Sequence, residues 1–165
     1  MKGAAAKIRF VRTGRLWAFA TLMRPANVVT AMADVLAGAA AAGTTGGLPG
    51  LLLSTAALYA GGVVLNDVFD AKLDARERPE RPIPSGRVSR GGAAALGGGL
   101  LALGVLLAGL VSHASFLVAA AVAAMVLLYD AWAKHHLLAG PLAMGACRGL
   151  NLLLGLSAAP ALMST

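Results

Sequence analysis

Five apolar segments follow one another along the chain, each close to the length that a helix needs to cross a lipid bilayer. A helix crosses the hydrocarbon core with about 20 mostly apolar residues. Hydrophobic residues make up 58% of the chain and charged residues only 13%, whereas soluble domains contain about 25% charged residues. We therefore predict one all-α transmembrane domain over residues 1–165, a polytopic membrane helical bundle with about five transmembrane helices. The expected spans are 16–42, 48–70, 92–112, 115–133 and 138–158.

The same composition excludes several other classes of protein. Disordered chains are poor in hydrophobic residues, and this chain is rich in them. A disulfide scaffold needs several cysteines, whereas Cys147 is the only one here. The formal net charge of +7 could suggest a nucleic-acid partner, but the basic residues lie in short blocks between apolar segments. We therefore expect these basic residues to lie at the surface of the lipid bilayer, and we expect no nucleic-acid partner.

The charged connections predict how the chain lies in the membrane. Basic residues occur in 1–15, in 71–91 and at Lys134, whereas 43–47 and 112–115 carry no Lys, Arg, Asp or Glu. Basic and neutral connections therefore alternate between the two sides. Because cytoplasmic loops carry the excess of Lys and Arg, we expect a cytoplasmic N-terminus with a basic lead-in over 1–15. We likewise expect a cytoplasmic loop over 71–91, in a protein of the cell inner membrane.

The first apolar segment carries two charges. A cleaved signal peptide is the alternative for the N-terminus, but the long basic lead-in and the interruption at Arg24-Pro25 favour a retained span. We expect Arg24 to reach the headgroups, as long basic side chains do near a helix end. Asp34 lies within the span, where a charge is usually paired, and Arg148 is the expected partner. A place for Asp34 in a substrate cavity is the alternative.

Acidic residues are concentrated at the end of the second segment. Of seven acidic residues in the chain, five fall within 67–80. On a helix, Asp67, Asp70 and Asp74 would lie within an arc of about 60°, with Asn66 on its flank. Three carboxylates so close together repel one another and need a cation, and their hard oxygen atoms suit Mg²⁺. The alternative is that these acids only pair with basic neighbours at a helix end.

The stretch after the acids favours the metal hypothesis. Its sequence, RPERPIPSGRVS at 78–89, contains three prolines, Pro79, Pro82 and Pro84, that stiffen the loop. Its arginines supply forked donors suited to phosphate oxygens. Acids that hold Mg²⁺ beside arginines that hold phosphate predict a site for a diphosphate.

These residues resemble the UbiA-type intramembrane prenyltransferases. The most specific match is NDVFDAKLD, which corresponds to the first Asp-rich motif of that family, followed directly by RPERPIPSG. The opening RPANVVTAMAD most resembles the EboC-like branch. Supporting matches are RPANVVTA (24–31), YDAWAK (129–134) and RGLNLLLG (148–155).

The resemblance implies a function and a set of site residues. It implies a helical fold around a central cavity, in which Mg²⁺ is held against the diphosphate of a polyprenyl donor and the prenyl group passes to an unknown acceptor. Asn66, Asp67, Asp70 and Asp74 would hold the metal, and the three aspartates would be catalytic. The implied diphosphate-binding residues are Lys72, Arg81 and Lys134, and the implied cavity residue is Asn27.

One feature departs from the family pattern. The family has a second Asp-rich motif after its sixth span, and after Asp74 this chain has only Asp130. The chain therefore corresponds to a partial UbiA-type fold, and a missing C-terminal half is an expected partner. The alternative function is a non-enzymatic helical membrane protein, such as a transport subunit or assembly partner. A CDP-alcohol phosphotransferase is excluded because its D-G-x-x-A-R signature is missing.

Overall fold

The computed structural model describes residues 15–159, and over these residues the chain is helical with short connections and no strands. The prediction of an all-α fold is therefore confirmed. The helices are α1 (Arg15–Leu22), α2 (Pro25–Ala41), α3 (Leu48–Phe69), α4 (Ala71–Glu77), α5 (Arg90–Gly109), α6 (His113–Ala131) and α7 (Ala139–Leu156), with a 3-10 turn η1 (Ala133–His135) after α6.

Three helical segments in the described part of the chain are long and apolar enough to cross a membrane: Leu48–Phe69, Arg90–Gly109 and His113–His135. A fourth apolar helix, Asn27–Ala41, is shorter, and α7 carries the charge of Arg148 within its length. The five predicted crossings therefore stay a prediction. Residues 1–14 of the predicted basic lead-in lie outside the described residues.

Two predicted segments differ from the structure. The first span, 16–42, is divided into α1 and α2 because Arg24 adopts a left-handed backbone conformation, with φ 45° and ψ 61°, just before Pro25. Proline disfavours the α conformation in the residue before it, so a helix commonly ends there. The expected loop 71–91 contains α4, whose sequence AKLDARE is rich in helix-forming residues.

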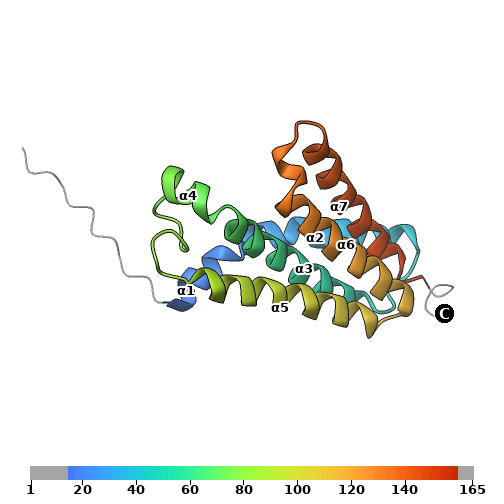
Figure 1. Cartoon of the computed structure of the whole chain (residues 1–165). Helices are drawn as coiled ribbons and strands as arrows, with labels where there is room; N and C mark the ends of the chain where they lie inside the picture. The colour runs from blue at the N-terminus through green and yellow to red at the C-terminus, as the bar shows by residue number, and fades with distance from the viewer. Residues whose placement is uncertain (1–14, 160–165) are drawn as a thin grey trace, which may run out of the picture.

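The bundle is organised around α3, which contacts α2, α5, α6 and α7. Figure 1 shows α5 lying along one side of α3, with α2, α6 and α7 on the other side. The connections alternate between the two ends of the bundle, so that α4 and the start of α5 lie at the end opposite the α2–α3 and α5–α6 connections (Figure 1). This topology places the acidic end of α3 beside α1, α4 and the start of α5.

Buried polar bonds fix the relative positions of the helices. The Ser54 hydroxyl on α3 donates to the carbonyl oxygen of Gly104 on α5 at 2.7 Å. Asn151 on α7 accepts from the Thr55 hydroxyl at 2.6 Å and donates to the Ala31 carbonyl oxygen at 2.7 Å. Asn151 therefore joins α2, α3 and α7 at one level of the bundle.

The helices α2 and α7 approach each other most closely at Gly38 and Gly155. A Cβ added to Gly38 would collide with backbone atoms of Leu152, and one added to Gly155 would collide with backbone atoms of Val35. Small residues at such positions allow membrane helices to come into contact. Backbone atoms cannot rotate away as a flexible side chain can, so the contact requires glycine at both positions.

Replacing Gly155 by alanine is expected to lower stability by about 3 kcal/mol, because the added methyl group overpacks this contact. The matched control is Gly149→Ala on the same helix, where an added Cβ would meet nothing within 4 Å. Alanine at that position gains helix propensity instead. Thermal unfolding in detergent, followed by circular dichroism, measures both. Equal melting temperatures for the two variants would contradict the close contact between α2 and α7.

Candidate active site

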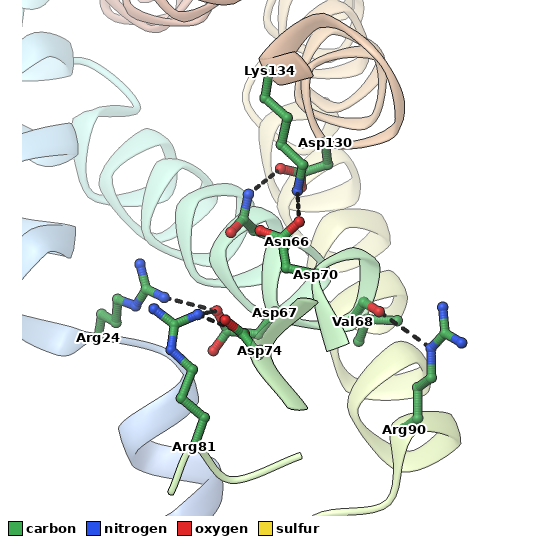
Figure 2. Close-up of polar contacts among 10 residues, drawn as sticks. All are labelled: Arg24, Asn66, Asp67, Val68, Asp70, Asp74, Arg81, Arg90, Asp130 and Lys134. Carbon is green, nitrogen blue, oxygen red and sulfur yellow. Dashed lines mark hydrogen bonds and ion pairs between the residues drawn. The ribbon is translucent and has the colours of Figure 1, made fainter. Parts of the chain in front are cut away.

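The acidic end of α3 brings two carboxylates onto one guanidinium. Asp67 lies in the last turn of α3 and Asp74 on α4, and both side chains are buried, with exposed fractions of 7% and 6%. Arg81, from the loop after α4, donates to Asp74 at 2.7 Å and to Asp67 at 3.2 Å. Figure 2 shows this guanidinium facing both carboxylates from one side. Two buried carboxylates therefore share a cation at the end of the bundle.

A second arginine reaches the same carboxylate from another part of the chain. Nη2 of Arg24 donates to Oδ1 of Asp67 at 2.7 Å, and Figure 2 shows Arg24 approaching from the side of α2. Arg24 is the only residue other than glycine with a positive φ among residues 15–159. A left-handed conformation costs about 1–3 kcal/mol in such a residue and is often found at functional sites. The expectation that Arg24 reaches the headgroups is therefore wrong for this structure, in which it binds Asp67.

The negative charges around Arg81 raise the pKa of its guanidinium. Partial burial alone would lower the pKa of Arg81, but the hydrogen bond to Asp74 and the negative charges of Asp67, Asp74 and Asp70 outweigh it. The pKa of Arg81 therefore lies above its ordinary value. The guanidinium stays charged, and it is a permanent donor at this site.

A second polar cluster lies beside the first. Nζ of Lys134 lies 2.7 Å from Oδ1 of Asp70, and the amide nitrogen of Asn66 donates to Oδ1 of Asp130 at 2.8 Å. Asp130 is only 2% exposed, and its Oδ2 has no hydrogen-bond partner in the described part of the chain. The two clusters together contain four acids, three basic side chains and one amide within one end of the bundle (Figure 2).

A cavity of about 650 Å³ begins at these clusters and extends between α2, α3, α6 and α7. Arg24, Asn66 and Asp130 line it at the acidic end. Apolar side chains of α3 and α6, among them Leu58, Val63 and Val126, line one side. The arrangement combines a charged mouth with a partly apolar interior, which suits a ligand with an anionic head and an apolar tail.

The structure separates some of the predicted site residues. Asp67 and Asp74 lie together, but Asp70 pairs with Lys134 instead, so the three acids do not share one site as predicted. Asn66, predicted as a metal ligand, binds Asp130. Lys72 is exposed on α4, outside both clusters. Asn27 is among the residues that line the cavity, and its contact with a substrate stays a prediction.

The sequence interpretation missed the roles of two residues at this end. Asp130 precedes Lys134 by four residues, yet Lys134 pairs with Asp70 and Asp130 accepts a hydrogen bond from Asn66. Arg24 was assigned to the headgroups. Both residues lie within stretches that match the family, Arg24 in RPANVVTA and Asp130 in YDAWAK. A charged residue within such a match was the feature that could have indicated a role at the site.

These residues fit Mg²⁺ in their chemistry, although not as the predicted set of three. Within residues 15–159, no three His, Cys, Asp or Glu side chains are arranged to hold a metal ion. Asp67 and Asp74, however, already share one cation, the guanidinium of Arg81. Mg²⁺ in proteins takes one or two carboxylates and completes its shell with phosphate oxygens and water. The pair Asp67 and Asp74 meets that requirement.

Known proteins share both the sequence and the fold of this chain. The digeranylgeranylglyceryl phosphate synthase of Ignicoccus hospitalis is 38% identical over 144 residues, which cover 87% of this chain and 48% of that protein. The protein of the same name from Methanothrix thermoacetophila is 37% identical over 144 residues, covering 84% of this chain and 54% of its own length. A solved structure from work on digeranylgeranylglyceryl phosphate synthase in membranes matches with a TM-score of 0.83 and 25% identity. That match covers 90% of this chain and 55% of the other.

The chain spans about half the length of the curated relatives it matches. The relatives named here do not test the EboC-like branch, which stays a prediction. The profile of the UbiA prenyltransferase family matches residues 27–164 and so includes both charged clusters and the whole cavity lining apart from Arg24. Together with the apolar helices, this match indicates an integral membrane protein. The chain belongs to the UbiA prenyltransferase family.

Proposed function

We propose that this chain takes part in the Mg²⁺-dependent transfer of a prenyl group from a polyprenyl diphosphate to a hydroxyl group of an acceptor lipid. The observation that carries the proposal is the pair of buried carboxylates, Asp67 and Asp74, which share a cation at the mouth of a partly apolar cavity. The relatives are named for a product that is a glyceryl phosphate bearing two geranylgeranyl groups. We therefore propose a glyceryl phosphate lipid as the acceptor.

The proposed donor binds with its diphosphate at the charged mouth. Asp67 and Asp74 would hold Mg²⁺, which when bound neutralises diphosphate charge and so favours its departure. Arg24 pairs with Asp67 and Arg81 pairs with both Asp67 and Asp74, so their remaining donors would be available to phosphate oxygens beside the metal. Lys134 adds a third positive charge from the end of α6. Asp70, paired with Lys134, fixes the position of that ammonium group.

The rest of the cavity serves the prenyl chain. The bond between the first prenyl carbon and the diphosphate oxygen breaks, and the diphosphate leaves with the electron pair. A carbon–oxygen bond then forms with the acceptor hydroxyl, and the released diphosphate takes up the hydroxyl proton. Leu58, Val63 and Val126 exclude water from the allylic cation that develops during this exchange.

The proposed orientation places this mouth on the cytoplasmic side of the inner membrane. Lys72, Arg76, Arg78 and Arg87 lie on α4 and the loop after it, at the same end as the charged mouth. Such an excess of basic residues is typical of cytoplasmic connections. Asn27, near the start of α2, then lines the cytoplasmic entrance of the cavity.

The experiment is prenyl transfer in nanodiscs with labelled geranylgeranyl diphosphate and a geranylgeranylglyceryl phosphate acceptor. We expect a labelled product with Mg²⁺ and none with EDTA, from the chain alone or together with the C-terminal half of a relative. That second arm is needed because the relatives are about twice as long. Absence of transfer in both arms, without binding of the diphosphate, would favour the alternative of a non-enzymatic transport subunit or assembly partner.

A further inference from the structure

The cavity has two chemically different walls. The wall formed by α3 and α6 has polar residues toward its ends, Thr55 at one and Asn66 and Asp130 at the other, and between them it is mainly apolar: Leu58, Tyr59, Gly62, Val63, Val122 and Val126. The wall formed by α2 and α7 carries polar side chains at a helical spacing, which places them on the face of each helix that lines the cavity. These residues are Asn27, Thr30 and Asp34 on α2 and Arg148 and Asn151 on α7. An isoprenoid chain suits the first wall, and the second wall suits a ligand with polar groups.

The polar groups of the second wall differ in their availability. Asn151 is buried, and both ends of its amide are used by Thr55 and Ala31. The ion pair of Asp34 and Arg148 is different. Arg148 donates to Asp34 through Nε at 3.3 Å and Nη2 at 2.8 Å, yet its side chain is 60% exposed, against 19% for Asp34. Arginine has five N–H donors in a planar fork, so the bonds to Asp34 leave the donors of Nη1 unused by that carboxylate, on a residue that lines the cavity.

This ion pair lies on the cavity wall, away from the charged mouth. Asp34 lies ten residues after Arg24, the residue that caps α2, which is about 15 Å along the helix axis. One turn beyond Asp34, α2 meets α7 at Gly38 and closes the space between them. A diphosphate held at Asp67 therefore does not reach Arg148 as well. Charged side chains within membrane helices commonly mark a substrate path.

We propose that Arg148 binds the phosphate of the acceptor lipid, with Asp34 as the resident counter-ion that keeps the guanidinium in place when the cavity is empty. The inference rests on the proposed function, because it assigns the second substrate of the same reaction. A guanidinium fork matches two oxygens of a phosphate, as it matches the carboxylate of Asp34. Phosphate and Asp34 therefore compete for Arg148. The acceptor is thereby specified as an anionic lipid, held on the α2–α7 wall while the prenyl chain lies on the α3–α6 wall.

The competition predicts effects of opposite sign. The probe is 1-O-hexadecylglyceryl phosphate, added to the full chain in nanodiscs of zwitterionic lipid, with 1-O-hexadecylglycerol as the arm without phosphate. We expect Arg148→Gln to weaken binding of the phosphate probe by about 30-fold. We expect Asp34→Asn to strengthen it by about threefold, because the guanidinium loses its competitor. Neither change should alter binding of geranylgeranyl diphosphate, and Arg76→Gln, on the exposed surface of α4, should alter neither.

Three results would overturn the inference. The first is binding of the phosphate probe that Arg148→Gln leaves unchanged, and the second is equal binding of hexadecylglycerol. The third is equal competition by two-chain phosphatidic acid, which would identify bulk lipid as the occupant. If a single variant fails to fold, the neutral double variant D34N/R148Q is tested in its place, and it must also lose the phosphate probe.

The same measurements separate this inference from the proposed function. If the unaltered chain does not bind geranylgeranyl diphosphate, the proposed function fails and the inference fails with it. If that diphosphate binds but the phosphate probe does not depend on Arg148, only the acceptor site is wrong.

Discussion

Replacing Asp67 by asparagine is expected to weaken Mg²⁺-dependent binding of geranylgeranyl diphosphate by about 100-fold, which corresponds to about 2.7 kcal/mol. The side chain keeps its size but loses the charge that is proposed to bind Mg²⁺ and that pairs with Arg24 and Arg81. Asp67 is the residue on which both arginines meet, so the change removes a proposed metal ligand and weakens the positioning of both guanidinium groups. Equilibrium binding of a fluorescent prenyl diphosphate, with Mg²⁺ and with EDTA, measures the effect.

The control for this variant is Glu77→Gln, which removes one negative charge from the same end of the molecule. Glu77 is exposed at the last position of α4, so its loss should change binding by less than about twofold. An equal effect of the two variants would mean that only the total charge of this end matters. Unchanged binding in Asp67→Asn would remove Asp67 from the proposed site.

The second large effect is expected from Arg81→Gln, and it concerns stability. Without this guanidinium, Asp74 loses its ion pair and the two buried carboxylates repel each other without a shared cation. Removing one partner of a buried ion pair costs about 3–5 kcal/mol, and since Arg81 is 22% exposed we expect about 3 kcal/mol. Thermal unfolding in detergent with EDTA measures this loss.

Magnesium should restore part of that stability. If Asp67 and Asp74 bind Mg²⁺, millimolar Mg²⁺ will raise the melting temperature of Arg81→Gln more than that of the unaltered chain, because the ion takes the place of the guanidinium. Arg76→Gln, on the exposed side of α4, should leave both the melting temperature and its response to Mg²⁺ unchanged. A response to Mg²⁺ that is the same in all three proteins would contradict binding at this pair.

Hydropathy was enough to predict the long helices α3, α5, α6 and α7, because burial in a membrane requires long apolar segments, but it did not predict the break between α1 and α2 or the polar helix α4. The sequence also located the acids at the C-terminal end of the second segment, since Asp67, Asp70 and Asp74 follow the apolar run directly. The pairing of Asp34 with Arg148 was predicted as well, and it is confirmed at 2.8 Å. In that case a single buried acid faced a single basic residue at similar depth, so few alternatives existed.

The partners of the acids could not be predicted in the same way. Asp67, Asp70 and Asp74 would share one helical face only on a continuous helix. In the structure α3 ends at Phe69 and α4 begins at Ala71, with Asp70 at ψ 0° between them. This junction turns Asp70 toward Lys134 and leaves Asp67 beside Asp74. The cations come from distant segments: Arg24 lies 43 residues before Asp67. Only the packing of α2 and α6 against α3 brings such residues together.

The left-handed backbone at Arg24 was also beyond sequence reasoning. Proline at position 25 disfavours a helix that continues through Arg24, but it does not indicate a positive φ, which arginine rarely adopts. In the structure this conformation accompanies the ion pair of the Arg24 guanidinium with Asp67. The ion pair therefore depends on the local backbone conformation as well as on the tertiary contact.

The most direct test of the account is electron–nuclear double resonance with Mn²⁺ in place of Mg²⁺, on the full chain in nanodiscs with geranylgeranyl diphosphate. We predict one tightly bound Mn²⁺ that shows hyperfine coupling to phosphorus and that is lost in Asp67→Asn. The contrary result is Mn²⁺ that couples to phosphorus equally with and without the protein, or that binds the variant as tightly as the unaltered chain. Either would mean that the carboxylates at the end of α3 do not hold the metal against the diphosphate.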